Sequence, residues 1–162
     1  MTAKMPDWLA EAYKYEGLKE VPGPKHNPQI QSWLRRLKAW WSDDETPWCG
    51  TFVAHCMEAT GHPIIKNWFR AREWGTYGAN LRPSHIAPGA ILVFSRAGGG
   101  HVGFYVGENA NFYYVLGGNQ KNQVRVDPIA KARCVAVRWP DGVPVTGRPV
   151  QMTGGVASTD EA

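Results

Sequence analysis

Hydrophobic residues recur at helical spacing in the first half of the chain, and this pattern predicts three helices. The first covers residues 6–16. The second covers residues 28–41, with Asn27 as its N-cap and its basic residues on the face opposite the hydrophobic one. The third covers residues 47–60, with Thr46 as its N-cap.

The pattern changes to strand-like alternation after the turn residues Pro88 and Gly89, which follow a segment of short helix and loop at residues 64–77. The expected strands are Ala90–Ser95, His101–Gly107, Asn111–Leu116, Gln123–Val126 and Cys134–Trp139. Short strands with short connections favour an antiparallel sheet, and helices that precede the strands favour the α+β class. We therefore expect N-terminal helices packed on a central antiparallel sheet of about five strands.

A single domain accounts for this organisation. A length of 162 residues is typical of one domain, which we expect to occupy residues 1–140. Residues 141–162 are rich in glycine, proline, threonine and serine and have no hydrophobic period. We expect them to form a flexible C-terminal tail.

The composition narrows the range of functions. Hydrophobic residues make up 43% and charged residues 20% of the chain, as in globular proteins. No hydrophobic run approaches the ~20 residues of a membrane-spanning helix, and no signal peptide is visible at the N-terminus. The net charge of +4 is scattered and lacks a nucleic-acid-binding motif. We therefore expect no nucleic-acid partner and no stable membrane insertion.

Cys49 is the strongest candidate for chemistry. It falls in the first turn of the third predicted helix, where backbone N–H groups are unpaired and the helix dipole is positive. Such a position lowers the pKa of a thiol and favours the nucleophilic thiolate. The alternative, a small buried hydrophobic residue, stays open at this point.

His101 and Asn119 are the candidate partners of Cys49. His101 begins a predicted strand after three glycines, where a ligand or the backbone can come close to its ring. Asn119 follows the neighbouring strand, and its amide can accept a hydrogen bond from the imidazole and fix its tautomer. An ordinary turn at Gly117–Asn119 is the alternative.

The other cysteines and histidines favour structural roles. Cys56 lies on the hydrophobic face of the third helix, and Cys134 lies within a strand. The spacing of cysteines and histidines matches no zinc motif, so we expect no metal and no cofactor. The residues that could either line a groove or pack in the core are Trp48, Trp68, Trp74 and Tyr105.

Four segments in this order carry a resemblance to a known family. They are Trp48–Val53, Pro88–Phe94, Gly100–Gly107 and Val115–Gln120. The ordered set resembles the CHAP and NlpC-type cysteine peptidases and amidases of bacterial cell walls, and it is most similar to their phage-associated endolysin branch. The resemblance covers about residues 6–140.

The resemblance implies a papain-like α+β fold without a cofactor or a metal. It implies Cys49 as nucleophile, His101 as base and Asn119 as the residue that orients the histidine. Where many CHAP enzymes carry an acidic residue, two positions before this asparagine, the chain has Gly117. Should Asn119 not be the third member, Gln120, Glu108, Tyr113 or a Cys–His dyad alone are the alternatives.

The function that the resemblance implies is that of a peptidoglycan hydrolase, similar to an endolysin, which cleaves an amide bond by a Cys–His thioester mechanism. It would be made in the host cytoplasm as a monomer and reach the periplasmic cell wall after release by a holin. An interbacterial toxin amidase of the same chemistry is one alternative. A non-catalytic wall-binding or virion protein on the same scaffold is another.

Overall fold

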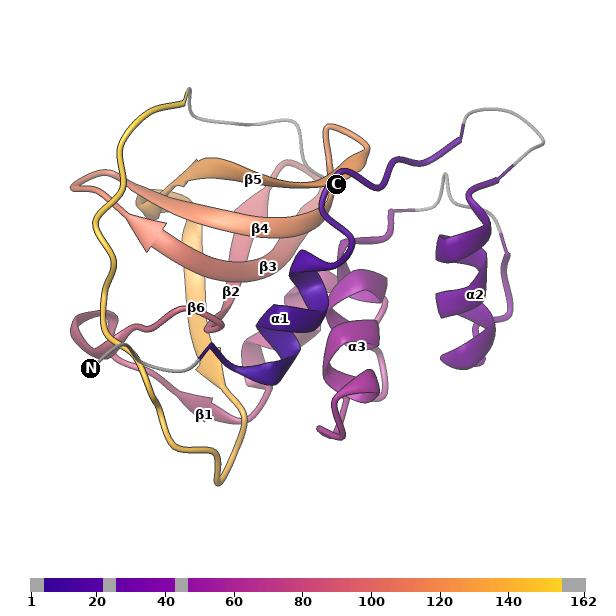
Figure 1. Ribbon diagram of the computed structural model, residues 1–162, viewed down its shortest axis with the longest axis horizontal. Coiled ribbons are helices and arrows are strands. Elements are labelled where there is room, and N and C mark those ends of the chain that lie inside the picture. The colour runs from indigo at the N-terminus through magenta and orange to yellow at the C-terminus, as the bar shows by residue number, and fades with distance from the viewer. Residues whose placement is uncertain (1–4, 22–25, 43–46, 156–162) are drawn as a thin grey trace.

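A six-stranded antiparallel sheet forms the centre of the protein, in the strand order β1-β6-β2-β3-β4-β5 (Figure 1). The computed structural model describes residues 5–21, 26–42 and 47–155. The strands are β1 (Ala79–Asn80), β2 (Ile91–Arg96), β3 (Gly99–Glu108), β4 (Phe112–Gln120), β5 (Gln123–Ala130) and β6 (Cys134–Trp139). With helices before the sheet in sequence, the expected α+β class is confirmed.

The sheet is larger than the sequence predicts. Strand β1 has only two residues, too few for an alternating pattern, and it pairs with β6. Strand β4 continues through Gly117 and Gly118, which had indicated a turn, and ends at Gln120. The β4–β5 turn then falls on Lys121 and Asn122, whose φ angles of 51° and 62° suit the two-residue turn of a tight hairpin.

In the part of the chain that the structure describes, three α-helices precede the sheet, at Asp7–Tyr13 (α1), Pro28–Arg36 (α2) and Cys49–Ala59 (α3). Helix α2 is shorter than expected because Lys38 adopts a left-handed conformation, with φ of 61°. The N–H of Ala39 then donates to the carbonyl of Leu34 at 2.9 Å, which closes the helix end. Trp41 therefore lies beyond the helix.

The third helix begins two residues later than predicted. Trp48 is its N-cap and Cys49 its first residue, so Pro47 lies outside it, and the proposed cap Thr46 lies outside the described residues. Cys49 is thus in the first turn, as expected.

The 3₁₀ helices are Ala71–Thr76 (η1), Pro83–His85 (η2) and Lys131–Arg133 (η3). None of the helices in the described ranges is long and apolar enough to cross a membrane.

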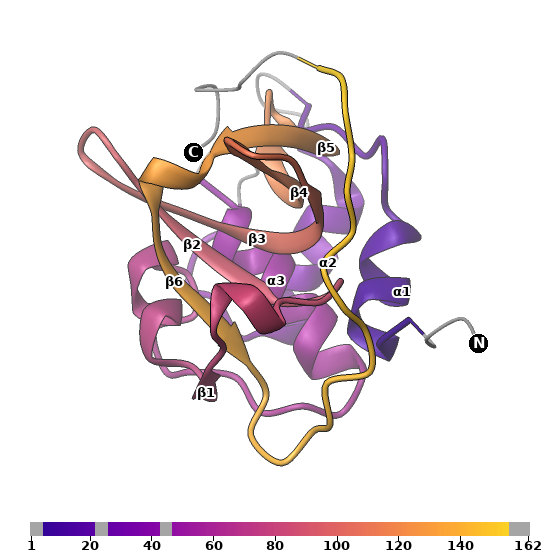
Figure 2. The same ribbon diagram turned by 90° about the vertical axis from the view of Figure 1, so that its left-hand side faces the viewer.

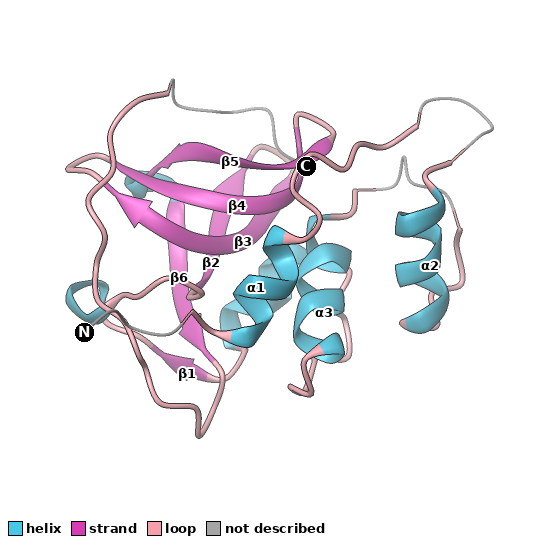
Figure 3. Cartoon of the chain, in the orientation of Figure 1, coloured by secondary structure: helices cyan, strands magenta, loops and turns pink. Residues whose placement is uncertain are grey.

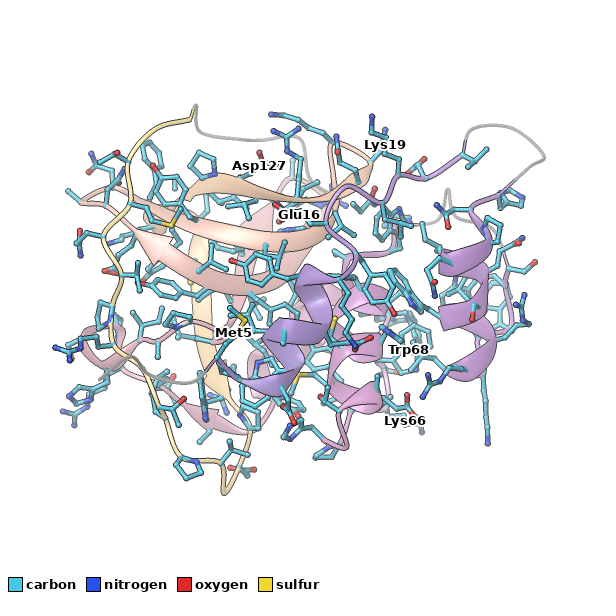
Figure 4. All side chains as sticks on the ribbon, in the orientation of Figure 1. Met5, Glu16, Lys19, Lys66, Trp68 and Asp127 are labelled. Atoms are coloured by element: carbon cyan, nitrogen blue, oxygen red, sulfur yellow. The ribbon has the colours of Figure 1, made fainter. Side chains whose placement is uncertain are left out.

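Helix α3 is the element that joins the two halves of the fold. It packs on β3 and β4, while α1 and α2 pack against α3, so the helices gather on one side of the sheet (Figure 3). Every residue of α3 from Cys49 to Met57 is buried. Side chains fill the space between the sheet and the helices (Figure 4). The aromatic residues with two possible roles belong to this core: Trp48, Trp68, Trp74 and Tyr105 are all buried.

The segment after β6 returns along the sheet and passes the ends of β3 and β4 (Figure 2). The N–H of Glu108 donates to the carbonyl of Val150 at 2.7 Å, and the N–H of Met152 donates to the carbonyl of Glu108 at 2.8 Å. The hydroxyl of Tyr114 donates to the carbonyl of Gly154 at 2.6 Å. Part of the segment that we expected to be a flexible tail is therefore hydrogen-bonded to the domain. The flexibility of residues 141–162 stays a prediction.

These contacts predict that deletion of residues 141–162 destabilises the domain. The deletion removes these three hydrogen bonds and two more, from the Val150 N–H to the Tyr105 hydroxyl and from Nε1 of Trp139 to the Val143 carbonyl. At about 1 kcal/mol each, their loss should lower the free energy of unfolding by about 5 kcal/mol. Thermal unfolding followed by circular dichroism measures the change. Tyr114→Phe, which removes one of these bonds, should give a loss of about 1 kcal/mol. An unchanged Tm in the truncated protein would show that the segment contributes nothing to stability.

Candidate active site

The fold brings Cys49 and His101 together, as the sequence predicts. Cys49 begins α3, His101 lies in β3, and their side chains are hydrogen-bonded. Both are buried: Cys49 is 3% exposed and His101 0%. The ring of His101 stacks on Phe94 of the neighbouring strand β2, with 6.3 Å between ring centroids. The histidine is thus fixed by the sheet and the cysteine by the helix.

The surroundings of Cys49 lower the pKa of its thiol. Burial acts in the opposite direction and is the largest single influence. The hydrogen bond and charge of His101, with backbone N–H groups of Val102 and Gly50 directed at the sulfur, outweigh it. The net effect favours the thiolate, which is the nucleophilic form of cysteine.

The residue that orients His101 is Gln120. The Nε2 atom of His101 lies 2.9 Å from Oε1 of Gln120, and both side chains are fully buried. The Gln120 amide nitrogen donates to the carbonyls of Val115 at 3.0 Å and Arg125 at 2.9 Å, so its oxygen must face the ring. Because that oxygen only accepts, Nε2 of His101 carries the proton, and Nδ1 is left for Cys49.

Asn119 does not take the position that the sequence assigned to it. Its Oδ1 atom is buried and has no hydrogen-bond partner in the described structure. The reason is a β-bulge in β4: Gly117 is opposite Arg125 and Gln120 is opposite Gln123, so β4 contains one extra residue. Asn119 adopts φ of 58° within this bulge, and the side-chain alternation shifts by one. Our expectation that the Asn119 amide orients His101 is therefore corrected to Gln120.

Gly117 leaves the space that this arrangement needs. A Cβ atom there would collide with Oε1 of Gln120 and lie 3.3 Å from Nε2 of His101. An acidic side chain at this position would displace Gln120 from the histidine. The prediction ended the strand at Leu116, before Gly117 and Gly118. Because a glycine inside a strand is a known signal of a bulge, extending the strand through these glycines could have indicated Gln120 from the sequence.

Cys56, Cys134 and His55 have structural surroundings. Burial raises the pKa of Cys56 well above its ordinary value and that of Cys134 to about 11. His55 is buried against Glu11, with 3.0 Å between Nε2 and Oε2, and stacks on Trp33. Among the described residues, no group of three or more histidine, cysteine or acidic side chains could hold a metal ion.

Cys49 lies at the edge of a cleft of about 390 Å³. One wall is formed by residues 69–73, which comprise the end of the loop before η1 and the first residues of η1. The other is formed by Arg96, Gly99 and Gly100 at the β2–β3 hairpin, next to His101. This cleft is therefore the candidate binding site for a substrate of Cys49.

His101→Ala should make Cys49 less reactive at neutral pH. Without the imidazole, burial is no longer outweighed, so the pKa of Cys49 should rise and the thiolate fraction at neutral pH should fall. We expect iodoacetamide to modify Cys49 at least about tenfold more slowly, measured by peptide mass spectrometry across a pH series. Cys56 serves as the internal control and should stay unreactive in both proteins. An unchanged pH dependence for Cys49 would contradict the pairing.

Gln120→Ala and Asn119→Gly distinguish the two amides. The Gln120 change removes the acceptor that holds the imidazole, so we expect the alkylation of Cys49 at neutral pH to slow by about tenfold. Asn119→Gly removes the side chain but keeps the left-handed backbone of the bulge, and it should have no such effect. The reverse ranking of the two variants would restore Asn119 as the orienting residue.

Comparison with known proteins agrees with this geometry. Residues 41–119 match the CHAP domain. The matched range contains Cys49 and His101 and ends one residue before Gln120. A comparison with curated proteins gives no significant match. The detection of a CHAP domain at residues 41–119 supports the assignment of this chain to the CHAP/NlpC-type peptidase family.

Proposed function

We propose that this protein is an endolysin-like peptidoglycan hydrolase that cleaves an amide bond through a thioester on Cys49. CHAP domains typically hydrolyse peptidoglycan, which gives the class of substrate. The observation that carries the proposal is the chain of contacts from Cys49 to His101 to Gln120. It combines a thiol of lowered pKa, a base and a group that orients the base, which is what covalent catalysis by cysteine requires.

In the first half of the proposed reaction, the sulfur of Cys49 attacks the carbonyl carbon of the substrate amide. Cys49 is the first residue of α3, so its backbone N–H has no acceptor within the helix and can stabilise the oxyanion. Such a donor contributes about 3 kcal/mol. His101, which holds at Nδ1 the proton that it has taken from the Cys49 thiol, gives that proton to the leaving amine. The carbon–nitrogen bond breaks, and a thioester remains on Cys49.

In the second half, water hydrolyses the thioester. His101 accepts a proton from the water at Nδ1, and the hydroxide attacks the thioester carbonyl. The carboxylic acid product leaves, and the sulfur of Cys49 returns to its starting form. Gln120 keeps its hydrogen bond to Nε2 throughout, because it accepts from both the neutral and the protonated ring.

The cleaved bond would be one of three amides of peptidoglycan. These are the N-acetylmuramoyl–L-alanine, L-alanine–D-glutamate and D-alanine–diaminopimelate bonds. Each presents a carbonyl that the proposed mechanism can attack. The endolysin-like role rests on the resemblance of the segments around Cys49, His101 and Gln120 to the phage-associated branch of the family.

Digestion of purified peptidoglycan tests the proposal and identifies the bond. We expect soluble products whose masses, measured by liquid chromatography and mass spectrometry, correspond to hydrolysis of one of the three amides. Cys49→Ala should abolish their release. Cys56→Ala should retain it, because Cys56 is buried and its raised pKa keeps the thiol protonated. Gln120→Ala should lower kcat by about 10- to 1000-fold.

Two outcomes would overturn the proposal. Product release by a folded Cys49→Ala protein would exclude the thioester mechanism. No release by the wild-type protein, despite a reactive Cys49, would favour a non-catalytic role or another substrate.

A further inference from the structure

Basic side chains outnumber acidic ones in the lining of the cleft beside Cys49. Arg70, Arg72 and Arg96 all line it, against one acidic residue, Glu73. The three arginines come from different places in the sequence: the loop before η1, η1 itself and the end of β2. Folding therefore concentrates positive charge next to the proposed nucleophile.

These arginines have no ion-pair partner among the described residues, whereas other surface charges do. Arg36 pairs with Glu58 at 3.0 Å, and Lys14 pairs with Glu11 at 2.8 Å. Charged clefts without internal partners attract ligands of the opposite sign, because a low-dielectric wall strengthens the field within them.

Backbone contacts hold two of the guanidinium groups at the β2–β3 hairpin. Nε of Arg96 donates to the carbonyl of Gly100 at 3.1 Å, and Nη1 of Arg72 makes a longer contact of 3.4 Å with the carbonyl of Gly99. A guanidinium has five N–H donors, so each group keeps donors for a ligand. Partial fixation lowers the entropy lost when such a ligand binds.

Gly100 allows Arg72 to reach this position. A Cβ atom on Gly100 would lie 2.5 Å from Cδ and 2.7 Å from Cγ of Arg72, so the arginine stem occupies the space over the glycine. The next residue in β3 is His101. Arg72 is thus placed beside the strand that supplies the proposed base.

We propose that Arg72 and Arg96, supported by Arg70, bind a carboxylate of the substrate next to the amide that Cys49 attacks. Arginine matches a carboxylate through paired, charge-assisted hydrogen bonds, and two arginines at one cleft supply both charge and direction. The inference rests on the proposed function and deepens it: the preferred substrate is a stem peptide with a free carboxylate, such as that of its glutamate, near the cleaved bond.

A pair of synthetic stem peptides tests this inference by binding. The peptides have the same sequence and differ only in whether the glutamate carries a free carboxylate or a carboxamide. Isothermal titration uses the full chain with Cys49→Ala, so that no turnover occurs. We expect the carboxylate peptide to bind at least about tenfold more tightly, and the difference to shrink at high salt. Equal affinity for the two peptides would overturn the inference.

Arginine variants locate the site. Arg72→Gln and Arg96→Gln should each remove most of the preference for the carboxylate. Arg72→Lys, which keeps the charge but loses the planar fork, should retain part of it and shows that any loss is not a folding defect. Arg82→Gln, a change of an exposed arginine outside the cleft, is the matched control and should leave the preference intact. A preference that survives both glutamine variants would place carboxylate recognition elsewhere.

Hydrolysis by the wild-type protein separates this inference from the proposed function. Cleavage of both peptides at equal rates would refute the carboxylate site and leave the hydrolase proposal intact. A carboxylate preference in binding without hydrolysis of either peptide or of peptidoglycan would support the site and refute the hydrolase proposal.

Discussion

The site depends on the packing of the first turn of α3 against β3. Because α3 is buried from Cys49 to Met57, the sheet on one side and α1 and α2 on the other fix where its first residue lies. The same contact places the sulfur against the ring of His101 and the N–H of Val102. A buried thiol would ordinarily be a poor nucleophile, and this contact reverses the effect.

A second consequence is a continuous chain of buried polar groups. It runs from Cys49 through His101 to Gln120 and ends on the carbonyls of Val115 and Arg125. Buried polar groups are costly unless they are paired, so each hydrogen bond limits the orientation of the next. The two carbonyls fix the orientation of the Gln120 amide, and the amide oxygen in turn fixes the proton on Nε2 of His101. The tautomer of His101 is therefore decided two hydrogen bonds away, by carbonyls of the sheet. The bulge in β4 is what makes this chain possible.

The cleft beside this site carries an excess of positive charge. Cys49 lies at its edge, and the arginines lie along its walls. Gly100 and His101 are adjacent in β3, so the strand that presents the proposed base also supports Arg72 and Arg96. Catalysis and recognition of an anionic substrate would thus use the same hairpin.

The sequence by itself determined the class of the fold, the place of Cys49 in the first turn of a helix and the strand that carries His101, because these follow from local periodicity and helix-terminal physics. The sequence also predicted structural roles for Cys56 and Cys134 from their neighbours, and the structure adds that burial raises the pKa of both thiols. Only the tertiary structure decided between Asn119 and Gln120, because a one-residue bulge reverses which side chain faces the histidine. It likewise decided the role of the arginines: they look scattered along the chain, and the meeting of η1 with the β2–β3 hairpin is a long-range contact that no local pattern contains.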